Sequence, residues 1–553
     1  MNALLSFLFR FDVMTGAFIV VIVPYFFMKA GAFLKEVQRK TKWPGIKEKK
    51  QQTTKALSGD LQADINEITG HIGHSSDVSI REFVIGSSGR KAALIYIDGL
   101  ADKHMIHEHL LNPLMKAEGG VKQESDSPDE LSGERFKAVL LNRLLPMTGV
   151  KENRALDDIL HGILTGSAAL IIDGFHDGIM IDVKGWKSRN IEEPITESLV
   201  RGPRVGFVEN LRDNTAILRR LSTNPNLTIT DYQIGKMAKA CSLVYIKGIA
   251  EEGLIEEVTE RINKIDLDDA LESGYIEELI EDNYLSFFPQ IQNTERPDRV
   301  MGALLEGRVA ILMDGTPFAL IVPVTFPMFF QTPEDYYERW LPMSLIRMLR
   351  FTAGFISVFL PSIYIAFVSF HQGMIPTKLA LSIASTRIGV PFPSLIEAIL
   401  MEVSIEILRE AGLRLPKPVG QTVGLVGGLV IGEAAVQASL VSPIMVIIVA
   451  LTAISSFAIP QYGTGISLRI LRFVAMFCSA TFGLYGILLF LLVLCIHFSK
   501  LESFGVPYFT PANIFSKVDL KDFIFRLPLF TMIRRPEEFS SVHNQYRRKK
   551  KRK

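Results

Sequence analysis

Four apolar runs in the C-terminal part of the chain are each close to the length that a lipid bilayer requires. They cover residues 345–370, 421–441, 443–459 and 471–498. A membrane-spanning helix needs about 20 mostly apolar residues, and it bonds all of its backbone polar groups internally. The runs therefore predict an all-α multi-span membrane domain over residues 331–500. A Glu-bearing helix over residues 394–411 separates the first two runs, and we expect it to be re-entrant or interfacial.

The region before residue 331 has a polar composition in which short β-type runs alternate with helical ones. This pattern predicts a two-part α/β cytoplasmic region, with a first subdomain over residues 51–118, a charged linker over 119–149 and a second subdomain over 150–330. An aliphatic strand followed by Asp-Gly occurs at Asp98, Asp173 and Asp314, and the last two Asp-Gly pairs predict hairpin turns. Asp314 and three nearby prolines also argue against a membrane helix over residues 308–330.

The charges are nearly balanced in number but segregated along the chain. Lys and Arg total 60 against 59 Asp and Glu, which excludes a globally basic nucleic-acid binder. Residues 1–50 hold an apolar stretch followed by a basic junction, residues 251–282 are strongly acidic, and residues 547–553 are all basic. By the positive-inside rule, the soluble region and the tail over residues 501–553 lie in the cytoplasm. The apolar stretch is an anchor candidate, either as a span or as a surface-lying helix.

Motifs for catalysis and for cofactor binding are missing from the sequence. It contains no P-loop, HExxH, GxSxG or dinucleotide-binding glycine pattern. Its three cysteines form neither a disulfide framework nor a zinc-binding spacing. The sequence therefore predicts a protein that is not an enzyme and that uses neither a cofactor nor a metal.

Glycines recur every four residues from Gly420 to Gly432, at the start of the run over 421–441, so they share one helix face. A partner helix can approach such a face closely. Glu433 and Gln437 form a polar pair on a neighbouring face. They lie at membrane depth, where a carboxylate must face water, a partner or a bundle interior. In a ring of identical subunits this helix would suit a cation pathway with two valines as an apolar gate. The alternative is an ordinary helix packed within one subunit. The candidate pore and helix-packing residues are Gly420, Gly424, Val426, Gly428, Val430, Gly432, Glu433 and Gln437.

The helix before this run carries four glutamates, three of them at spacing four. Like charges on one helix face repel, so this face is solvated or paired with Arg409, Arg414 or Lys417. One interpretation is an acidic vestibule that concentrates cations at a pore mouth. The other is an ordinary solvated interfacial face. The residues concerned are Glu397, Glu402, Glu406 and Glu410.

Several long motifs are similar to the A-subunit family of bacterial spore germinant receptors, the GerA type. They include ESLVRGPRVGFVENLRDNTAILRRL, GRVAILMDGTPFALIVP, QTPEDYYERW and GLVIGEAAVQASLVSP, within a resemblance that covers about residues 77–530. A close paralogue family, encoded with the dipicolinic-acid transport proteins of the spore, shares the architecture. The apolar stretch before Lys35 and the uniformly basic tail depart from the usual pattern of the family.

The resemblance implies a nutrient-sensing receptor subunit in the spore inner membrane. It also implies assembly with a transporter-like B subunit and a lipoprotein C subunit, and homo-oligomerisation into a nutrient-gated cation channel that triggers germination. A different class of function is a non-conducting scaffold that relays a signal to the B subunit. A secondary transporter is disfavoured because the sequence shows no repeated halves.

Overall fold

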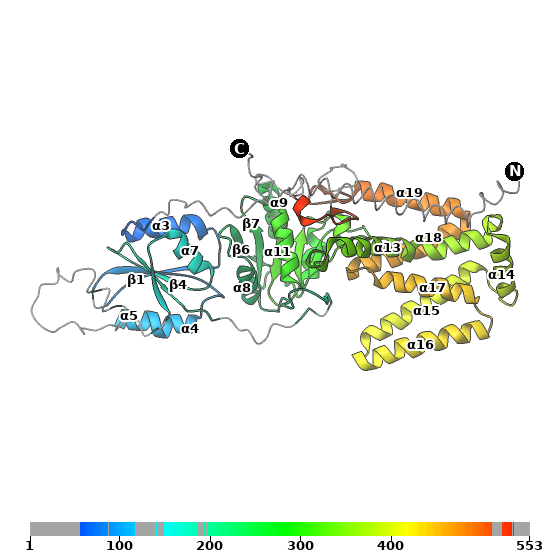
Figure 1. Cartoon of the computed structure of the whole chain (residues 1–553), viewed down its shortest axis with the longest axis horizontal. Coiled ribbons are helices and arrows are strands. Elements are labelled where there is room, and N and C mark those ends of the chain that lie inside the picture. Colours follow the sequence, from blue (N-terminus) through cyan, green and yellow to red (C-terminus); the bar gives the residue numbers. More distant parts are fainter. Residues whose placement is uncertain are drawn as a thin grey trace, which may run out of the picture. The chain divides into compact units, whose positions relative to one another are not determined.

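The computed structural model describes residues 56–86, 88–116, 136, 140, 147, 149–185, 193–194, 196–510, 522–532 and 535. The anchor candidate over residues 1–50, most of the predicted linker and the basic tail over 547–553 lie outside these residues. The described chain forms two β-sheet units followed by a set of helices (Figure 1). We call residues 56–185 sheet domain 1, residues 196–324 sheet domain 2 and residues 340–500 the helical domain.

Sheet domain 1 is a five-stranded antiparallel sheet with strand order β1-β2-β4-β5-β3. Helices α3 and α7 cover one face, and the π-helix η1 and α5 cover the other (Figure 1). The alternating residues of β2 and β4 explain the two cores, because successive side chains of a strand point to opposite faces. The elements are α3 Leu61–Ile72, β1 Val78–Val84, β2 Lys91–Ile97, α4 Lys103–Met105, η1 Ile106–Leu111, α5 Asn112–Lys116, β3 Val150–Asn153, α7 Leu156–Leu164, β4 Ala168–Ile172 and β5 Gly178–Ile181.

Sheet domain 2 repeats this topology, with strand order β6-β7-β9-β10-β8 and every pairing antiparallel. Helices α9 and α10 cover one face, and α8 and α11 the other. The elements are α8 Leu211–Leu221, β6 Leu227–Ile234, β7 Lys239–Ile246, α9 Glu252–Asn263, α10 Ser273–Ile280, β8 Gln292–Thr294, α11 Pro297–Glu306, β9 Val309–Met313 and β10 Ala319–Val322.

Two of the three Asp-Gly pairs occupy equivalent positions in this duplication. Asp173 follows β4 and accepts a hydrogen bond at 3.3 Å from the backbone N–H of Leu61, the first residue of α3. Asp314 follows β9 and accepts one at 3.1 Å from Leu211, the first residue of α8. In each case a carboxylate satisfies a free N–H at a helix N-terminus. The two predicted hairpins are confirmed, whereas Asp98 lies outside a hairpin and pairs with Lys103 at 2.9 Å.

The sheets divide the chain later than the boundary predicted at residue 150. Strands β3, β4 and β5 pair with the first sheet, since β2 runs antiparallel to β4. The strands before and after residues 119–149, the stretch predicted as a linker, therefore belong to the same sheet. The physical reason is that β2 is buried on both faces and needs β4 as its second neighbour in the sheet.

A buried ion pair joins the two sheet domains. The Arg219 guanidinium on α8 contacts both carboxylate oxygens of Asp77, at 2.7 and 2.8 Å, next to β1. It also donates to Ser75 Oγ at 2.6 Å and to the carbonyl oxygen of Leu227 at 2.7 Å. Arg219 is 1% exposed, so the protein itself supplies the contacts that replace its water.

The helical domain begins where the chain leaves sheet domain 2 through η3 and α12. The first apolar run is α13 and the Glu-bearing segment is α15, as expected. The run predicted over residues 471–498 is wrong as one helix, because Gly483, at φ 61°, separates α18 from α19. The elements are η3 Phe326–Phe330, α12 Glu334–Tyr337, α13 Trp340–Ser369, η4 Gln372–Met374, α14 Thr377–Arg387, α15 Ser394–Arg414, α16 Lys417–Gln437, α17 Pro443–Phe457, α18 Tyr462–Phe482, α19 Leu484–Lys500, β11 Glu502–Ser503, β12 Val506–Pro507 and η6 Leu529–Thr531.

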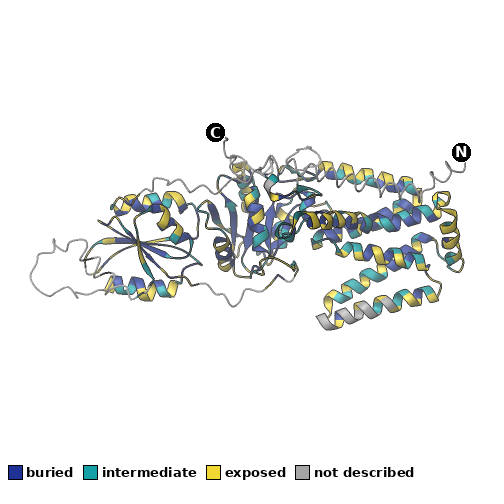
Figure 2. Ribbon diagram, in the orientation of Figure 1, coloured by how far each residue is buried: buried dark blue, intermediate teal, exposed yellow. Residues whose placement is uncertain are grey.

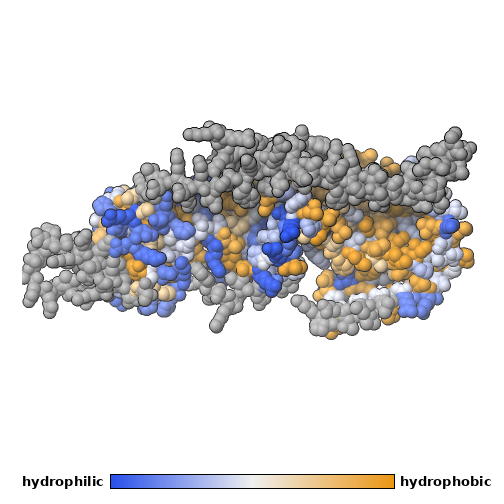
Figure 3. All heavy atoms as spheres, in the orientation of Figure 1, coloured by the Kyte–Doolittle hydropathy of each residue, from blue (hydrophilic) through white to orange (hydrophobic). Residues whose placement is uncertain are grey.

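Two of the described helices, α13 and α18, are long and apolar enough to cross a membrane, and α17 and α19 are shorter apolar helices. Much of their outer surface is apolar, and hydrophobic residues cover much of the visible face of this domain (Figure 3). Sheet domain 1 shows mainly hydrophilic side chains in the same view. The described chain is therefore mixed α/β in its N-terminal part and helical in its C-terminal part.

Candidate functional site

The predicted glycine helix is α16, and it forms a helical hairpin with α15. At the closed end of this hairpin, a Cβ on Gly420 would lie 2.6 Å from the carbonyl oxygen of Gly412. Real Cβ atoms do not approach a backbone oxygen so closely, so residue 420 must be a glycine for the two backbones to meet. Gly420 therefore packs α16 within the subunit.

The next glycines of the stripe face open space. A Cβ on Gly424 or Gly428 would have no neighbour within 4 Å, and one on Gly432 would lie 3.7 Å from a methyl group of Val446. Both open glycines are exposed, and Val430 nearby is 55% exposed. Figure 2 shows α16 with little buried surface where it is described. The Val426 side chain lies outside the described residues.

The polar pair on α16 is also at the surface. Gln437 Nε2 donates to Glu433 Oε1 at 3.1 Å, and both residues are exposed. One helical turn separates them, as their spacing predicts. The subunit alone therefore leaves a carboxylate, an amide and a glycine-lined face of α16 unpacked.

The four glutamates of α15 each contact an arginine. Glu397 is buried, pairs with Arg387 at 2.7 Å and accepts a hydrogen bond at 3.1 Å from the backbone N–H of Ser442. Glu402 is buried against Arg472 of α18, and both side chains are 0% exposed. Neither arginine was expected as a partner from the sequence.

The last two glutamates have the partners expected from their spacing. Glu406 pairs with Arg409 at 2.9 Å and also faces Arg469 of α18 at 3.5 Å. Glu410 pairs with Arg414 at 2.6 Å on the exposed end of the helix. Each of the four carboxylates thus has an arginine partner, and Arg469 adds a fifth guanidinium to the cluster.

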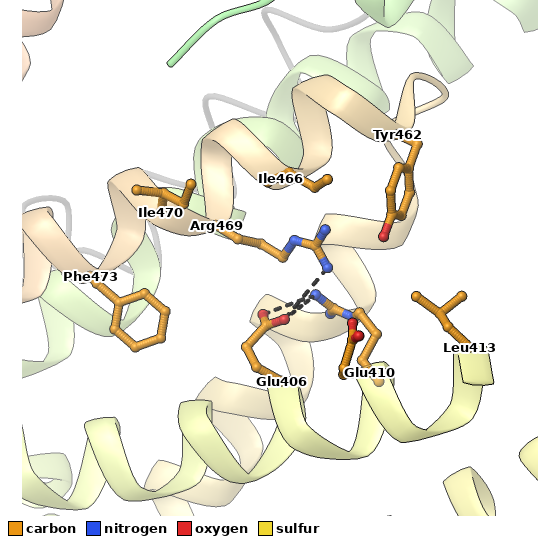
Figure 4. A pocket seen from close by; sticks show the side chains of 9 residues that line it. Glu406, Glu410, Leu413, Tyr462, Ile466, Arg469, Ile470 and Phe473 are labelled. Carbon is orange, nitrogen blue, oxygen red and sulfur yellow. Dashed lines mark hydrogen bonds and ion pairs between the residues drawn. The ribbon is translucent and has the colours of Figure 1, made fainter. Parts of the chain in front are cut away.

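A cavity of about 310 Å³ opens between α15 and α18 beside this cluster (Figure 4). Figure 4 shows Arg469 of α18 extending toward Glu406 of α15. Arg409 of α15 also lines the cavity and pairs with the same carboxylate. Arg409 also donates to Ser456 at 3.2 Å. Glu410 also lines the cavity, and aliphatic and aromatic side chains form the remaining wall: Leu413, Tyr462, Ile466, Ile470 and Phe473. Polar and apolar walls thus meet in one cavity.

A second ionic cluster forms at the start of the helical domain, in the QTPEDYYERW motif. Asp335 is fully buried and contacts Arg347 at 3.0 Å and Arg350 at 2.6 Å, both on α13. Burial alone would raise the pKa of Asp335, but the hydrogen bond from Arg350 and the two guanidinium charges outweigh it and hold the pKa below its usual value. Arg347 also pairs with Asp522 at 2.7 Å, so the segment after α19 returns to this point. The segment that follows sheet domain 2, α13 and the segment after α19 thus share one junction.

The sequence contained a signal for both clusters, although it did not identify the partners. Arg469 and Arg472 lie in an apolar helix three residues apart, as do Arg347 and Arg350. A guanidinium in such a helix requires an acidic partner or water. The spacing places both arginines of a pair on one helix face, but only the packing of α13, α15 and α18 shows which carboxylate each one meets.

Comparisons with known proteins identify the family of this chain. The family described as Bacillus/Clostridium GerA spore germination protein matches residues 66–538. The N-terminal domain of the A subunit of the Bacillus megaterium spore germinant receptor GerK3 is 34% identical, covering 50% of this chain and 99% of that one, with a TM-score of 0.38.

Relatives from Bacillus subtilis extend over most of the chain. Spore germination protein B1 is 43% identical over 87% of this chain and 97% of its own length. Spore germination protein KA is 45% identical over 88% and 87%, and spore germination protein A1 is 53% identical over 67% and 77%. This chain therefore belongs to the GerA family of spore germination proteins.

Proposed function

We propose that this chain is the A subunit of a germinant receptor in the spore inner membrane, and that copies of it assemble around a cation pathway lined by α16. Membership of the GerA family supports the receptor role. The proposed partners are a transporter-like B subunit and a lipoprotein C subunit. The sheet domains and the C-terminal tail lie on the cytoplasmic side, as the charge distribution favours.

The observation that carries the channel proposal is the unpacked face of α16. Gly424 and Gly428 meet no other atoms of the subunit, although a glycine stripe is suited to close contact with another helix. Glu433 is exposed on the same helix with the neutral Gln437 amide as a hydrogen-bond donor, and a carboxylate facing lipid is costly. A ring of subunits resolves both features, because neighbouring helices cover the glycines while the carboxylate faces a water-filled lumen.

In such a ring the helix supplies both a gate and a selectivity element. Val430 is exposed and lies on the α16 segment before Glu433. Together with Val426 it forms an apolar constriction that closes by dewetting, and a ring of Glu433 carboxylates favours cations. Because arginines neutralise the glutamates of α15, the charge that selects cations in this proposal belongs to Glu433.

The test is the oligomeric mass and the conductance of the purified receptor. Gly428→Leu adds a side chain where the single subunit has open space, so the fold is retained but a neighbouring helix is pushed away. Gly253→Leu is the matched control, because Gly253 is also an exposed helical glycine with no neighbour within 4 Å, on α9 of sheet domain 2. We expect Gly428→Leu alone to reduce the oligomer to monomers.

Conductance separates a channel from a scaffold. With B and C subunits and germinant present, the wild-type protein should pass a cation current, and Val430→Ala should leak without germinant. An oligomer that never conducts refutes the channel and leaves the scaffold function. An oligomer unaffected by Gly428→Leu refutes assembly through α16.

The scaffold remains the second candidate because of the Asp335 junction. This junction ties α12, which follows sheet domain 2 in the chain, to α13 through buried ion pairs, as a subunit that relays a signal between cytoplasm and membrane requires.

A further inference from the structure

The ion pairs at the cavity between α15 and α18 hold one more positive than negative charge. Arg409 and Arg469 line the cavity and share the Glu406 carboxylate, whereas Arg472, which does not line it, has Glu402 as its own partner. The Glu410 and Arg414 pair at the exposed end adds no net charge. Because these arginine side chains are 0–13% exposed, bulk water does not compensate the extra charge.

Hydrogen-bond donors in this cluster also lack partners. Within the part of the chain that the structure describes, three donor atoms of the cluster are buried without an acceptor, Arg409 Nε and both Nε and Nη2 of Arg472, against one acceptor without a donor, Glu402 Oε1. Arg469 makes only the 3.5 Å contact with Glu406 and lies over the Tyr462 ring, with 5.7 Å between Cζ and the ring centroid. Buried donors are normally satisfied, so the cluster requires an additional acceptor. The missing charge and the missing acceptor are both those of an anion.

The rest of the cavity is apolar and extends along α18. Arg469 reaches back toward Tyr462 at the beginning of the helix, where Gln461 bonds to Asn293 of sheet domain 2 at 2.5 Å. Phe473 lies eleven residues after Tyr462, which corresponds to about 16 Å along the helix axis. The anion-binding groups are therefore near one end of a membrane-helix candidate, and the apolar wall runs toward its middle.

We propose that this cavity binds one anionic phospholipid. Its phosphate receives hydrogen bonds from Arg409 and Arg469, and an acyl chain lies against Ile470 and Phe473. The phosphate balances the extra positive charge, and guanidinium groups match phosphate geometry well. A free phosphate has the same headgroup chemistry, but it leaves the apolar wall uncovered. The inference does not depend on ion conduction.

The test measures lipid binding to the full-length protein in an uncharged detergent. Phosphatidylglycerol or phosphatidylcholine is added, and retained lipid is counted by native mass spectrometry alongside the midpoint of thermal unfolding. We expect phosphatidylglycerol alone to be retained and to raise the midpoint. Arg469→Gln should weaken its binding about tenfold or more, the effect of losing a charged hydrogen bond.

Arg414→Gln is the matched control, because it removes the same charge from the exposed end of α15, where Arg414 is 80% exposed. It should retain lipid binding within about twofold, as expected for an exposed ion pair. Should Arg469→Gln fail to fold, Ile466→Trp fills the cavity and keeps every charge, and it should release the lipid. Equal binding of both lipids, or equal loss in Arg469→Gln and Arg414→Gln, overturns the proposal. Protection by inorganic phosphate alone equal to that by phosphatidylglycerol overturns the assignment to a lipid.

Discussion

The buried ion pair between Arg219 and Asp77 predicts how firmly the two sheet domains are held together. Arg219→Met removes the guanidinium and leaves the Asp77 carboxylate buried without its partner. Removing one member of a buried ion pair costs about 3–5 kcal/mol. The cost is paid only in states where the domains are closed, so it lowers the free energy of separating them. A loss of about 3 kcal/mol corresponds to roughly 150-fold more frequent opening.

Hydrogen exchange measured by mass spectrometry detects this opening in the backbone amides of β1 and α8. The matched control is Arg212→Met, because Arg212 is also on α8 and also pairs with sheet domain 1, through Asp98, but its side chain is 63% exposed. An exposed pair is worth about 1 kcal/mol or less, so exchange should rise about fivefold at most. Replacing both buried partners by apolar residues, with Asp77→Leu and Arg219→Met together, should restore most of the protection. If Arg219→Met and Arg212→Met increase exchange equally, the reasoning from burial is wrong.

Three further predictions concern single side chains. Asp314→Ala removes the acceptor at the start of α8 and should destabilise sheet domain 2 by about 1 kcal/mol, measured by thermal unfolding against Asp60→Ala, which removes an exposed cap of α3. Burial and the neighbouring carboxylates raise the pKa of Glu277 to about 7, so the folded state holds this proton more tightly than the unfolded state does. The stability of sheet domain 2 should therefore fall as pH rises from about 4.5 to about 7. Glu277→Gln should abolish that fall when unfolding is measured against pH, and an unchanged slope contradicts the prediction. Glu402→Gln leaves the Arg472 charge buried and should destabilise the helical domain by about 3 kcal/mol in detergent unfolding, whereas the double replacement Glu402→Leu with Arg472→Met should be nearly neutral.

The local features of this fold could be read from the sequence because they depend on neighbouring residues. Alternating apolar residues and Asp173-Gly174 or Asp314-Gly315 turns specify hairpins within a few positions. The pairing of β2 with β4 joins residues about 75 positions apart, and no short-range pattern specifies it. The break at Gly483 was missed because a glycine in an apolar run is compatible with a continuous membrane helix.

The candidate site was predictable to a similar extent. The spacing of Gly420 to Gly432 placed the glycines on one face of α16, and the hairpin with α15 decided which of them meet their own subunit. The glutamates of α15 suggest a negative surface because the partners of Glu397 and Glu402 lie on other helices. The neutralising effect of Arg387 and Arg472 emerges only when α14, α15 and α18 are packed.

The Asp335 junction has a mechanical consequence for α13. Arg347 and Arg350 both pair with the Asp335 carboxylate from one face of α13, and Arg347 also pairs with Asp522. Rotation of α13 about its axis would break both contacts with Asp335 at once and leave buried charges without partners. Tilting of α13 therefore costs less than rotation, and the first turns of the helix are the pivot. A displacement of sheet domain 2 would then be largest at the far end of α13, and smallest at the junction itself.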